Sequence, residues 1–203
     1  MKLKYWKKSE RSAYLSLDDE IWGVLSLRTL QRLHPFSSEL DISETQSQHL
    51  ISELEKKAWW QITEYLAKAE HSEHQCRLFL GRKDYHKSII DRCIELCKEK
   101  GYLDDARFAE ILIRSLFERG KSARAITEKL YEQRIPPALY EPILQELQDP
   151  EQNRQLLREQ IQKLLYKHRA QEPWKAKEKV YASLFRKGFS LDEIAQAWEG
   201  PDE

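Results

Sequence analysis

Apolar residues recur at helical spacing along most of the chain, but the first 26 residues follow a different pattern. Two short apolar runs, at residues 14–17 and 21–25, flank the polar sequence Asp18-Asp19-Glu20. Short apolar runs joined by a polar turn are typical of a β-hairpin. The chain is therefore expected to begin with β structure.

Two helix starts follow the hairpin. Ser26 has the side chain of an N-cap before a short helix, which Pro35 is expected to end. The sequence Ser43-Glu44-Thr45-Gln46 has the form of a capping box before a helix that contains Leu50 and Leu54. The hairpin and these helices predict a small α+β module over residues 1–55.

From Lys56 onward, the apolar pattern repeats about every fifty residues. The first set of apolar positions is Cys76, Leu80, Tyr85, Ile90 and Cys93. A shift of 50 residues (126 − 76) gives Ile126, Leu130, Ile135, Tyr140 and Ile143, and a further 54 gives Val180, Leu184, Phe189, Ile194 and Ala197. A longer apolar helix precedes each set, so each copy is a three-helix unit that needs neighbours to complete its core. We expect a mainly α protein with tandem helix-turn-helix-like repeats over residues 56–102, 103–149 and 150–203.

Turn and cap residues support these helix boundaries. Gly101 and Gly120 suit the left-handed position after a helix end, and Ser122 suits an N-cap. Pro136-Pro137 suits a helix start, and Ser190-Leu191-Asp192-Glu193 is a further capping-box sequence. The local signals therefore agree with the repeat.

The composition is highly charged but balanced. Of 203 residues, 33% are charged, and 34 basic side chains offset 34 acidic ones. Zero net charge excludes a uniformly basic nucleic-acid-binding protein, so any electrostatic surface must come from local clusters. The basic start lacks the apolar run of a signal peptide, and no stretch approaches the roughly 20 apolar residues of a membrane span. These features predict a cytoplasmic protein with no membrane contact.

The three cysteines, Cys76, Cys93 and Cys97, are interpreted as reduced thiols, and two of them fall on apolar positions of the repeat. Together with His74 and His86 they make the grouping most suggestive of metal chemistry. A metal-dependent enzyme using these five residues is one alternative. Because no CxxC pair is present, we predict no metal and no cofactor.

Common catalytic signatures are missing from the sequence, which has no GxxxxGK[ST], GxGxxG, HExxH or GxSxG motif. The adjacent carboxylates Asp104-Asp105 are interpreted as a helix start, and those of residues 18–20 as the hairpin turn. We therefore expect no catalytic residues and a protein that acts by binding.

Two basic clusters are candidate binding sites. Residues 151–188 hold ten Lys and Arg against four Glu, and a second cluster surrounds the turn at Gly120. Long cationic side chains there could project together toward an acidic surface or toward phosphates. The predicted contact residues are Arg114, Arg119, Lys121, Arg124, Lys167, Lys175, Lys179 and Arg186.

Most aromatic residues are expected in the core. Those that fall in helical apolar stripes are Trp59, Trp60, Phe108, Phe117, Phe185 and Phe189. Trp174, beside Pro173 and among lysines, could instead stack on a base or cover a helix end.

The sequence Gly101-Tyr102-Leu103-Asp104-Asp105-Ala106-Arg107-Phe108-Ala109 resembles the signature of the RecX family, regulators of the RecA recombinase. Arg114, with residues 120–126 and 130–135, is similar to the family's helix-turn-helix stretch. Residues 186–190 with Ile194 resemble its C-terminal end. The resemblance covers roughly residues 56–200, and the hairpin module is similar to an N-terminal extension of some members.

This resemblance implies a stack of three-helix repeats, curved into an elongated array, that lodges in the groove of RecA filaments on single-stranded DNA. It implies a role in homologous recombination, DNA repair and the SOS response, in which binding mostly inhibits the ATPase, recombinase and coprotease activities of RecA. It implies no reaction of the protein's own. We expect a monomer, since no heptad seam is evident. The alternative is a RecA-independent helix-turn-helix protein that binds DNA directly.

Overall fold

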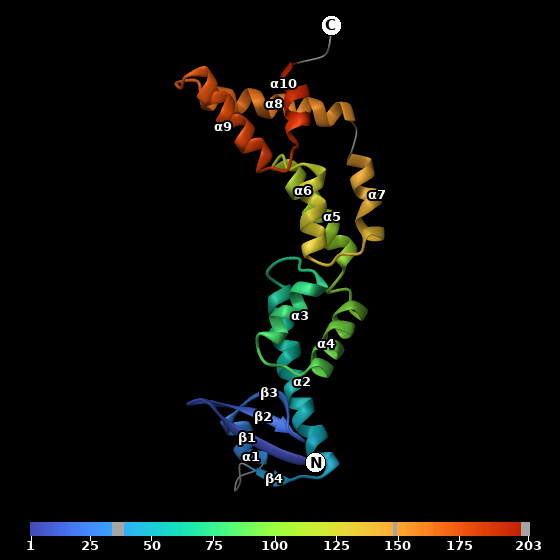
Figure 1. The fold of residues 1–203 in the computed structure, drawn as a ribbon. Helices are drawn as coiled ribbons and strands as arrows, with labels where there is room; N and C mark the ends of the chain where they lie inside the picture. The colour runs from blue at the N-terminus through green and yellow to red at the C-terminus, as the bar shows by residue number, and fades with distance from the viewer. Residues whose placement is uncertain (34–38, 148–149, 200–203) are drawn as a thin grey trace. The chain divides into compact units, whose positions relative to one another are not determined.

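The computed structural model describes residues 1–33, 39–147 and 150–199. The chain forms two compact units, Met1–Asp104 and Asp105–Glu203. Figure 1 shows that the β strands all lie in the first unit, whereas the second is helical. The predicted class, mainly α with a small N-terminal α+β module, is confirmed.

The first unit begins with a four-stranded antiparallel sheet in the order β3-β2-β1-β4. The predicted hairpin is confirmed, because its turn residues Asp18 and Asp19 have φ angles of 48° and 66°, as a two-residue turn between twisted strands requires. The sequence pattern predicts neither β1 nor β4, the two strands that extend the sheet beyond this hairpin. The strands are β1 (Lys2–Ser9), β2 (Ser12–Leu17), β3 (Glu20–Ser26) and β4 (Glu39–Asp41).

Four helices complete the first unit: α1 (Leu27–Leu33), α2 (Glu44–Leu66), α3 (Glu73–Gly81) and α4 (Lys87–Glu99). Both predicted caps are present. The Ser26 hydroxyl accepts a hydrogen bond from the Thr29 amide at 3.0 Å, and Ser43 forms a reciprocal capping box with Gln46. Pro35, the predicted end of α1, lies outside the described residues.

Helix α2 passes through residue 55, where the sequence suggests that the N-terminal module ends. One buried core explains this continuity. It contains Leu3 and Leu15 from the sheet, Leu54 and Ile62 from α2, and Ile94 from α4. Because α2 buries residues against both the sheet and the following helices, these parts form a single unit.

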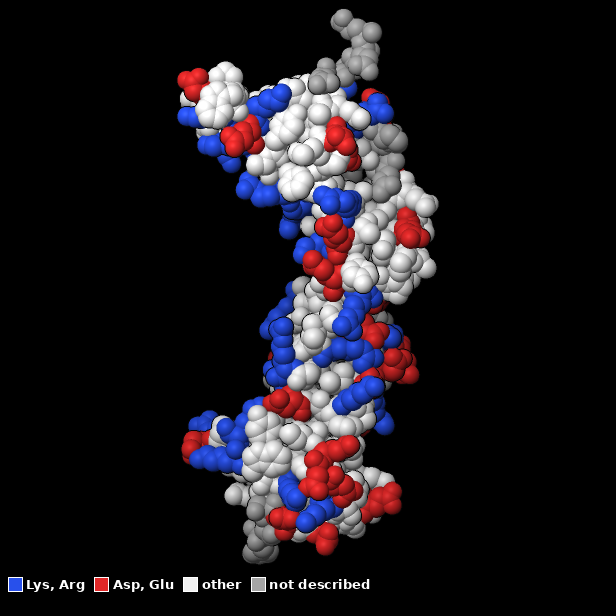
Figure 2. Space-filling view, viewed as in Figure 1, with Lys and Arg blue, Asp and Glu red and all other residues white. Residues whose placement is uncertain are grey.

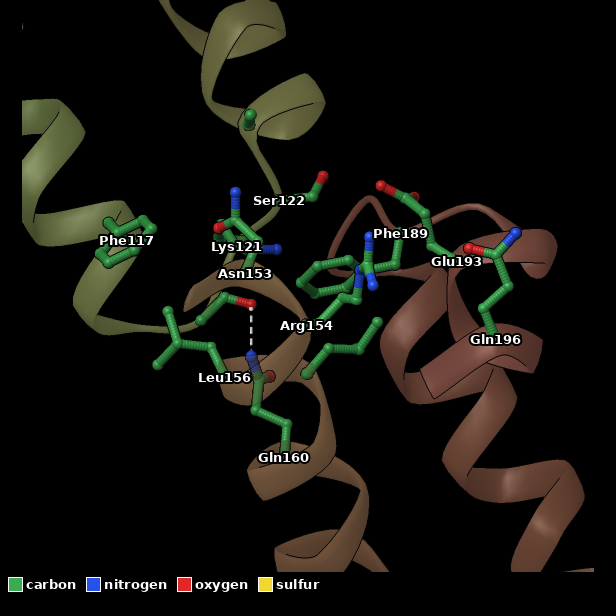
Figure 3. A pocket seen from close by; sticks show the side chains of 13 residues that line it. Phe117, Lys121, Ser122, Asn153, Arg154, Leu156, Gln160, Phe189, Glu193 and Gln196 are labelled. Atoms are coloured by element: carbon green, nitrogen blue, oxygen red, sulfur yellow. Dashed lines mark hydrogen bonds between the residues drawn. The ribbon is translucent and has the colours of Figure 1, made fainter. Parts of the chain in front are cut away.

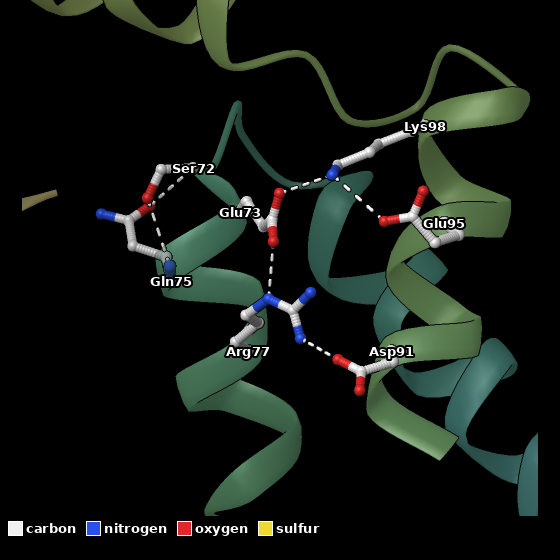
Figure 4. Close-up of polar contacts among 7 residues, drawn as sticks. All are labelled: Ser72, Glu73, Gln75, Arg77, Asp91, Glu95 and Lys98. Atoms are coloured by element: carbon white, nitrogen blue, oxygen red, sulfur yellow. Dashed lines mark hydrogen bonds and ion pairs between the residues drawn. The ribbon is translucent and has the colours of Figure 1, made fainter. Parts of the chain in front are cut away.

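A polar network fixes α3 against α4, as Figure 4 shows. Ser72 caps α3 in a second reciprocal capping box. The Glu73 carboxylate accepts hydrogen bonds from Arg77 at 2.6 Å and pairs with Lys98 of α4 at 2.7 Å. Arg77 also donates to Asp91 of α4. The two helices are thus joined by alternating charges in addition to their apolar core.

The second unit consists of two three-helix domains. The first contains α5 (Asp105–Glu118), α6 (Ala123–Glu132) and α7 (Pro137–Leu147), and the second α8 (Pro150–Lys167), α9 (Pro173–Phe185) and α10 (Leu191–Glu199). Each has its own buried cluster, centred on Ile126 and Leu130 in the first and on Val180 and Leu184 in the second. The boundary predicted between residues 149 and 150 touches residues 148–149, which the structure does not describe.

The predicted repeat is confirmed by burial and by backbone conformation. All its aligned apolar positions are buried except Ile90 and Ile143, which are half-buried against the same clusters. In addition, Asp84, Arg134 and Gly188 have φ angles of 64°, 57° and 100°. These three residues are related by the same shifts of 50 and 54, so each copy uses a left-handed residue between its second and third helices.

Two aromatic assignments were wrong. Trp60 is 59% exposed and Phe185 is 55% exposed. Trp60 lies two residues from both Ala58 and Ile62, which places it on the opposite side of α2 from that buried face, since a helix turns about 100° per residue. Phe108 and Phe189 are buried as predicted, and Trp59 and Phe117 pack half-buried against the cores.

Candidate partner-binding surface

The turn between α5 and α6 presents the first basic cluster. Gly120 has a φ angle of 68°, and Ser122 accepts a hydrogen bond from the Ala125 amide at 3.3 Å, so the predicted turn and N-cap are confirmed. Lys121 stands between them. A left-handed glycine followed by a cap fixes the direction in which this lysine leaves the helix pair.

This turn packs against the turn between α9 and α10. The Ser122 amide donates to the Lys187 carbonyl at 3.0 Å, and the Lys121 ammonium donates to the Arg186 carbonyl at 3.2 Å. The Arg124 guanidinium donates to the Gly188 carbonyl at 3.1 Å. We call this contact the turn-to-turn interface. Three of the predicted residues meet in it, Lys121 and Arg124 through their side chains and Arg186 through its main-chain carbonyl.

Gly188 is required for this close approach. A β-carbon added there would lie 2.4 Å from the Ser122 hydroxyl and 2.5 Å from the Ala125 β-carbon. The equivalent residues of the other copies, Asp84 and Arg134, are not glycines. Residue 188 is therefore a glycine for two reasons: a glycine accepts the left-handed backbone conformation, and its lack of a side chain allows the two domains to come into contact.

A pocket of about 430 Å³ lies beside the interface, as Figure 3 shows. Gln160 of α8 connects its walls: the amide donates to the Gly120 carbonyl at 3.3 Å and accepts a hydrogen bond from the Lys187 ammonium. Arg154 and Glu193 line the same space. Sequence reasoning missed Gln160, because an isolated glutamine on a helix gives no signal of its contact forty residues earlier.

The interface concentrates positive charge. Burial lowers the pKa of the Lys187 ammonium, and the nearby charges of Lys121 and Lys163 lower it further. Lys163 and Lys187 belong to the positive segment identified in the sequence but are not among the predicted contact residues. Their proximity to Lys121 shows that the two basic clusters converge in space.

Helix α9 extends this positive region. Lys175, Lys179 and Arg186 are separated by four and seven residues, so they share one side of the helix, and all three side chains are exposed. Figure 2 shows Lys and Arg side chains gathered along α9 toward the turn-to-turn interface. Trp174 begins this helix with 63% exposure, and the Lys175 ammonium lies 5.2 Å from its ring centroid.

The remaining predicted residues lie outside the interface. Arg114 is held by Glu110 on its own helix, with guanidinium–carboxylate distances of 3.0 and 2.8 Å. Arg119 is exposed just before Gly120, and Lys167 is exposed at the end of α8. The structure thus gathers three of the eight residues at the interface, continues them with Lys175 and Lys179 along α9, and leaves the other three apart.

Among the residues considered for metal binding, the three cysteines pack in the first core and His86 packs against an aromatic ring. Cys76, Cys93 and Cys97 are buried in the first core, and His86 stacks on Trp22 with ring centroids 4.4 Å apart. Burial raises the pKa of the Cys93 and Cys97 thiols to about 11. Within the described ranges, no group of three or more His, Cys, Asp or Glu is arranged to hold a metal ion.

Comparison with known proteins identifies the helical domains. Residues 104–141 match the family model described as RecX, second three-helix domain, and residues 151–198 match RecX, third three-helix domain. The chain is 27% identical over 142 residues to Regulatory protein RecX of Vibrio parahaemolyticus, covering 68% of this chain and 87% of that protein. It is 29% identical over 158 residues to the protein of that name from Geobacillus kaustophilus, covering 77% and 58%.

Solved structures share the fold. A crystal structure of regulatory protein RecX superposes with a TM-score of 0.62 at 18% identity, covering 98% of this chain and all of that one. RecX from Lactobacillus salivarius superposes with a TM-score of 0.59 at 20% identity, covering 73% of this chain and 96% of that one. Fold and comparisons together define a protein of tandem three-helix domains with a small sheet module. Over residues 104–141 and 151–198, and in its fold, the chain is similar to the RecX family of regulatory proteins.

Proposed function

We propose that this protein binds the RecA recombinase and its filament on single-stranded DNA, and that binding mostly inhibits the ATPase, recombinase and coprotease activities of RecA. The similarity of its second and third three-helix domains to those of the RecX family is the observation that supports this proposal. The protein acts as a cytoplasmic monomer, by binding and without a reaction of its own.

The contact surface combines the turn-to-turn interface with the exposed side of α9. Lys175 and Lys179 make no ion pair with a carboxylate among the described residues, so their charges are available to an acidic protein surface or to phosphates. Lys121 donates to a carbonyl group, which does not neutralise its charge, whereas Arg124 donates to a carbonyl group and also pairs with Glu128 of its own helix at 3.6 Å. The proposed contact residues are Arg114, Arg119, Lys121, Arg124, Lys167, Lys175, Lys179 and Arg186.

Charge reversal on α9 tests this surface without disturbing the interface. The double variant Lys175→Glu/Lys179→Glu should bind RecA filaments on single-stranded DNA about tenfold more weakly, on the order of 1.4 kcal/mol, in a co-sedimentation assay. The matched control is Lys87→Glu/Lys129→Glu, which makes the same change at two exposed lysines that belong to α4 and α6. Equal binding by both variants, with helicity unchanged, contradicts the assignment of α9.

The helix-turn-helix arrangement and the exposed lysines of α9 also favour a second candidate, a DNA-binding protein that acts without RecA. It predicts retention on DNA with steep salt dependence in a sample that contains no recombinase. The same sedimentation series, run on DNA alone, separates the two functions: binding that requires RecA supports the regulator, and identical binding without RecA supports the alternative.

A further inference from the structure

The first unit contains a stack of aromatic rings that the proposed function does not use. Tyr65, near the end of α2, lies against His71 and Phe79 with ring centroids 3.8 and 4.2 Å apart and interplanar angles of 14° and 6°. Gln75 holds the His71 ring, with Nδ1 3.1 Å from its amide oxygen. Three nearly parallel rings are thus already aligned in the absence of a ligand.

A pocket of about 460 Å³ opens on this stack. The exposed side chain of Leu78 and two cationic residues complete its lining. The Lys83 ammonium lies 4.9 Å from the Phe79 ring centroid, and the positive charge of Arg82 acts on the Tyr65 hydroxyl. Among the described residues, neither Arg82 nor Lys83 has a carboxylate at ion-pair distance. The pocket therefore offers planar rings and positive charge side by side.

Positive charge continues from the pocket toward the sheet. The Lys57 ammonium donates to the Val24 carbonyl at 2.6 Å. Burial lowers the pKa of Lys57, and the charges of Lys8 and Lys83 lower it further, which places three lysines near one another. Lys8 pairs with Asp84, the residue after Lys83, at 2.5 Å.

A second aromatic pair lies at the far end of these lysines. Trp6 of β1 stacks on Tyr14 of β2 with ring centroids 5.5 Å apart, and Trp6 is 44% exposed. The Lys8 ammonium lies 4.7 Å from the Tyr14 ring centroid. The surface thus contains the Trp6–Tyr14 pair, then the neighbouring lysines Lys8, Lys57 and Lys83, and then the three-ring stack.

His71 and Phe79 cover the two faces of Tyr65, and Lys83 lies over the Phe79 ring. We propose that this surface binds single-stranded nucleic acid, with a base stacking on the outer face of His71 at the end of the three-ring stack and phosphates contacting Arg82 and Lys83. Bases stack on aromatic side chains while a basic track follows the phosphates in proteins that bind single strands without sequence preference. An acidic peptide matches the charge of this surface but has no planar group for its rings. The prealigned stack lowers the entropy lost on binding. This site belongs to the first unit, whereas the residues proposed to contact RecA belong to the second.

The test uses the full chain and a fluorescent oligothymidylate of about 16 nucleotides, with no recombinase present. Fluorescence anisotropy should show that Arg82→Gln/Lys83→Gln weakens binding at least about fivefold, whereas the control Lys100→Gln, at another exposed lysine of the same unit, changes it less than about twofold. Circular dichroism of each variant verifies that the helices are retained.

Two further measurements separate base stacking from charge alone, and this site from α9. An oligonucleotide of the same length without bases should bind at least about fivefold more weakly, as loss of one stacked base predicts. Photocrosslinking with 5-iodouracil should label the segment 65–83. Equal affinity for the abasic strand, unchanged binding by the double variant, or crosslinks confined to residues 105–199 would each overturn the proposal, as would binding of polyglutamate in place of DNA. None of these results bears on inhibition of RecA.

Discussion

At the scale of single residues, one left-handed position recurs in all three copies with different side chains. Asp84, which is half-buried and pairs with Lys8 of β1, and Arg134, which is exposed, both have a positive φ angle at this turn. Gly188 has the same backbone role, but its missing side chain also admits Ser122 and Ala125 of the neighbouring domain. The repeat therefore explains the conformation, and the turn-to-turn interface explains the glycine.

Gly188→Ala should lower the free energy of unfolding of the second unit by about 2 kcal/mol or more. The new β-carbon would add strain at a φ angle of 100° and overlap atoms 2.4 and 2.5 Å away. Denaturant unfolding followed by circular dichroism measures this loss. Gly81→Ala is the matched control, since a β-carbon at the end of α3 meets nothing within 4 Å. A Gly188→Ala protein as stable as the control would contradict the close approach.

The buried thiols should react slowly while the protein is folded. Because burial raises the pKa of Cys93 and Cys97 to about 11, the reactive thiolate is roughly a hundredfold scarcer at neutral pH than for a thiol at the ordinary value of 9.0. A colorimetric disulfide reagent should therefore label these cysteines only after denaturation. Ser88→Cys, at an exposed position of α4, should label at once in the native protein. Fast native labelling of Cys93 or Cys97 would show that the core is not closed around them.

At the scale of helices, the Glu73 carboxylate is the centre of the charge network that joins α3 to α4. Burial alone would raise the pKa of Glu73, but hydrogen bonds from Lys98 and Arg77 outweigh it and lower the pKa below its ordinary value of 4.5. Stability from a carboxylate with a lowered pKa is fully present above the unfolded value and is lost as the pH falls through the folded one. The contribution of Glu73 should thus weaken as the pH falls into the acid range.

Glu73→Gln should lower the free energy of unfolding at pH 7 by about 1 to 2 kcal/mol, because Lys98 and Arg77 lose a charged acceptor. The difference from the unchanged protein should shrink below pH 4.5, where Glu73 itself becomes protonated. Urea unfolding at a series of pH values tests this convergence. Glu95→Gln removes the more exposed carboxylate beside Lys98 and should have a smaller effect. A constant difference across the acid range would contradict the role of Glu73.

The sequence predicts the helices well because each buries one stripe, and the stripes of three copies reinforce one another. It does not predict β1, whose alternation of Leu3 and Tyr5 with lysines is brief and rich in charge. Strand β4 has three residues and is defined by its pairing with β1. Trp60 and Phe185 lie near apolar stripes in sequence but turn away from the buried side of their helices. The periodicity of apolar residues therefore predicts that a helix is present more reliably than it predicts which residues at the edge of its apolar stripe are buried.

For the candidate surface too, the sequence predicts which charges are present but not how they pack together. Charge counting finds Lys121, Arg124 and Arg186, but their meeting depends on packing between domains, which Gln160 and Gly188 help to build. No local pattern marks Gln160 as a contact of Gly120. Arg114, by contrast, is identified by its cluster yet pairs with Glu110 within its own helix. Sequence reasoning therefore locates the positive region but does not distinguish residues that pack from residues that face a partner.

At the scale of the whole molecule, zero net charge and local positive surfaces are compatible because acidic and basic residues are separated along the chain. Binding through the α9 surface should be sensitive to salt, since exposed charges are screened within about 8 to 10 Å at physiological ionic strength. Raising the salt concentration should weaken binding of the unchanged protein to RecA filaments more steeply than binding of Lys175→Glu/Lys179→Glu. If sedimentation showed that salt weakens binding of both proteins equally steeply, the contact would lie on another surface.

The central claim is that this protein regulates RecA by binding it. The most direct test is the single-stranded-DNA-dependent ATPase of the cognate RecA, titrated with this protein from substoichiometric to equimolar amounts. The account predicts a dose-dependent fall in ATP hydrolysis and a shift of the titration to higher concentration for Lys175→Glu/Lys179→Glu. An unchanged ATPase rate in the presence of the folded protein would contradict the proposed regulation.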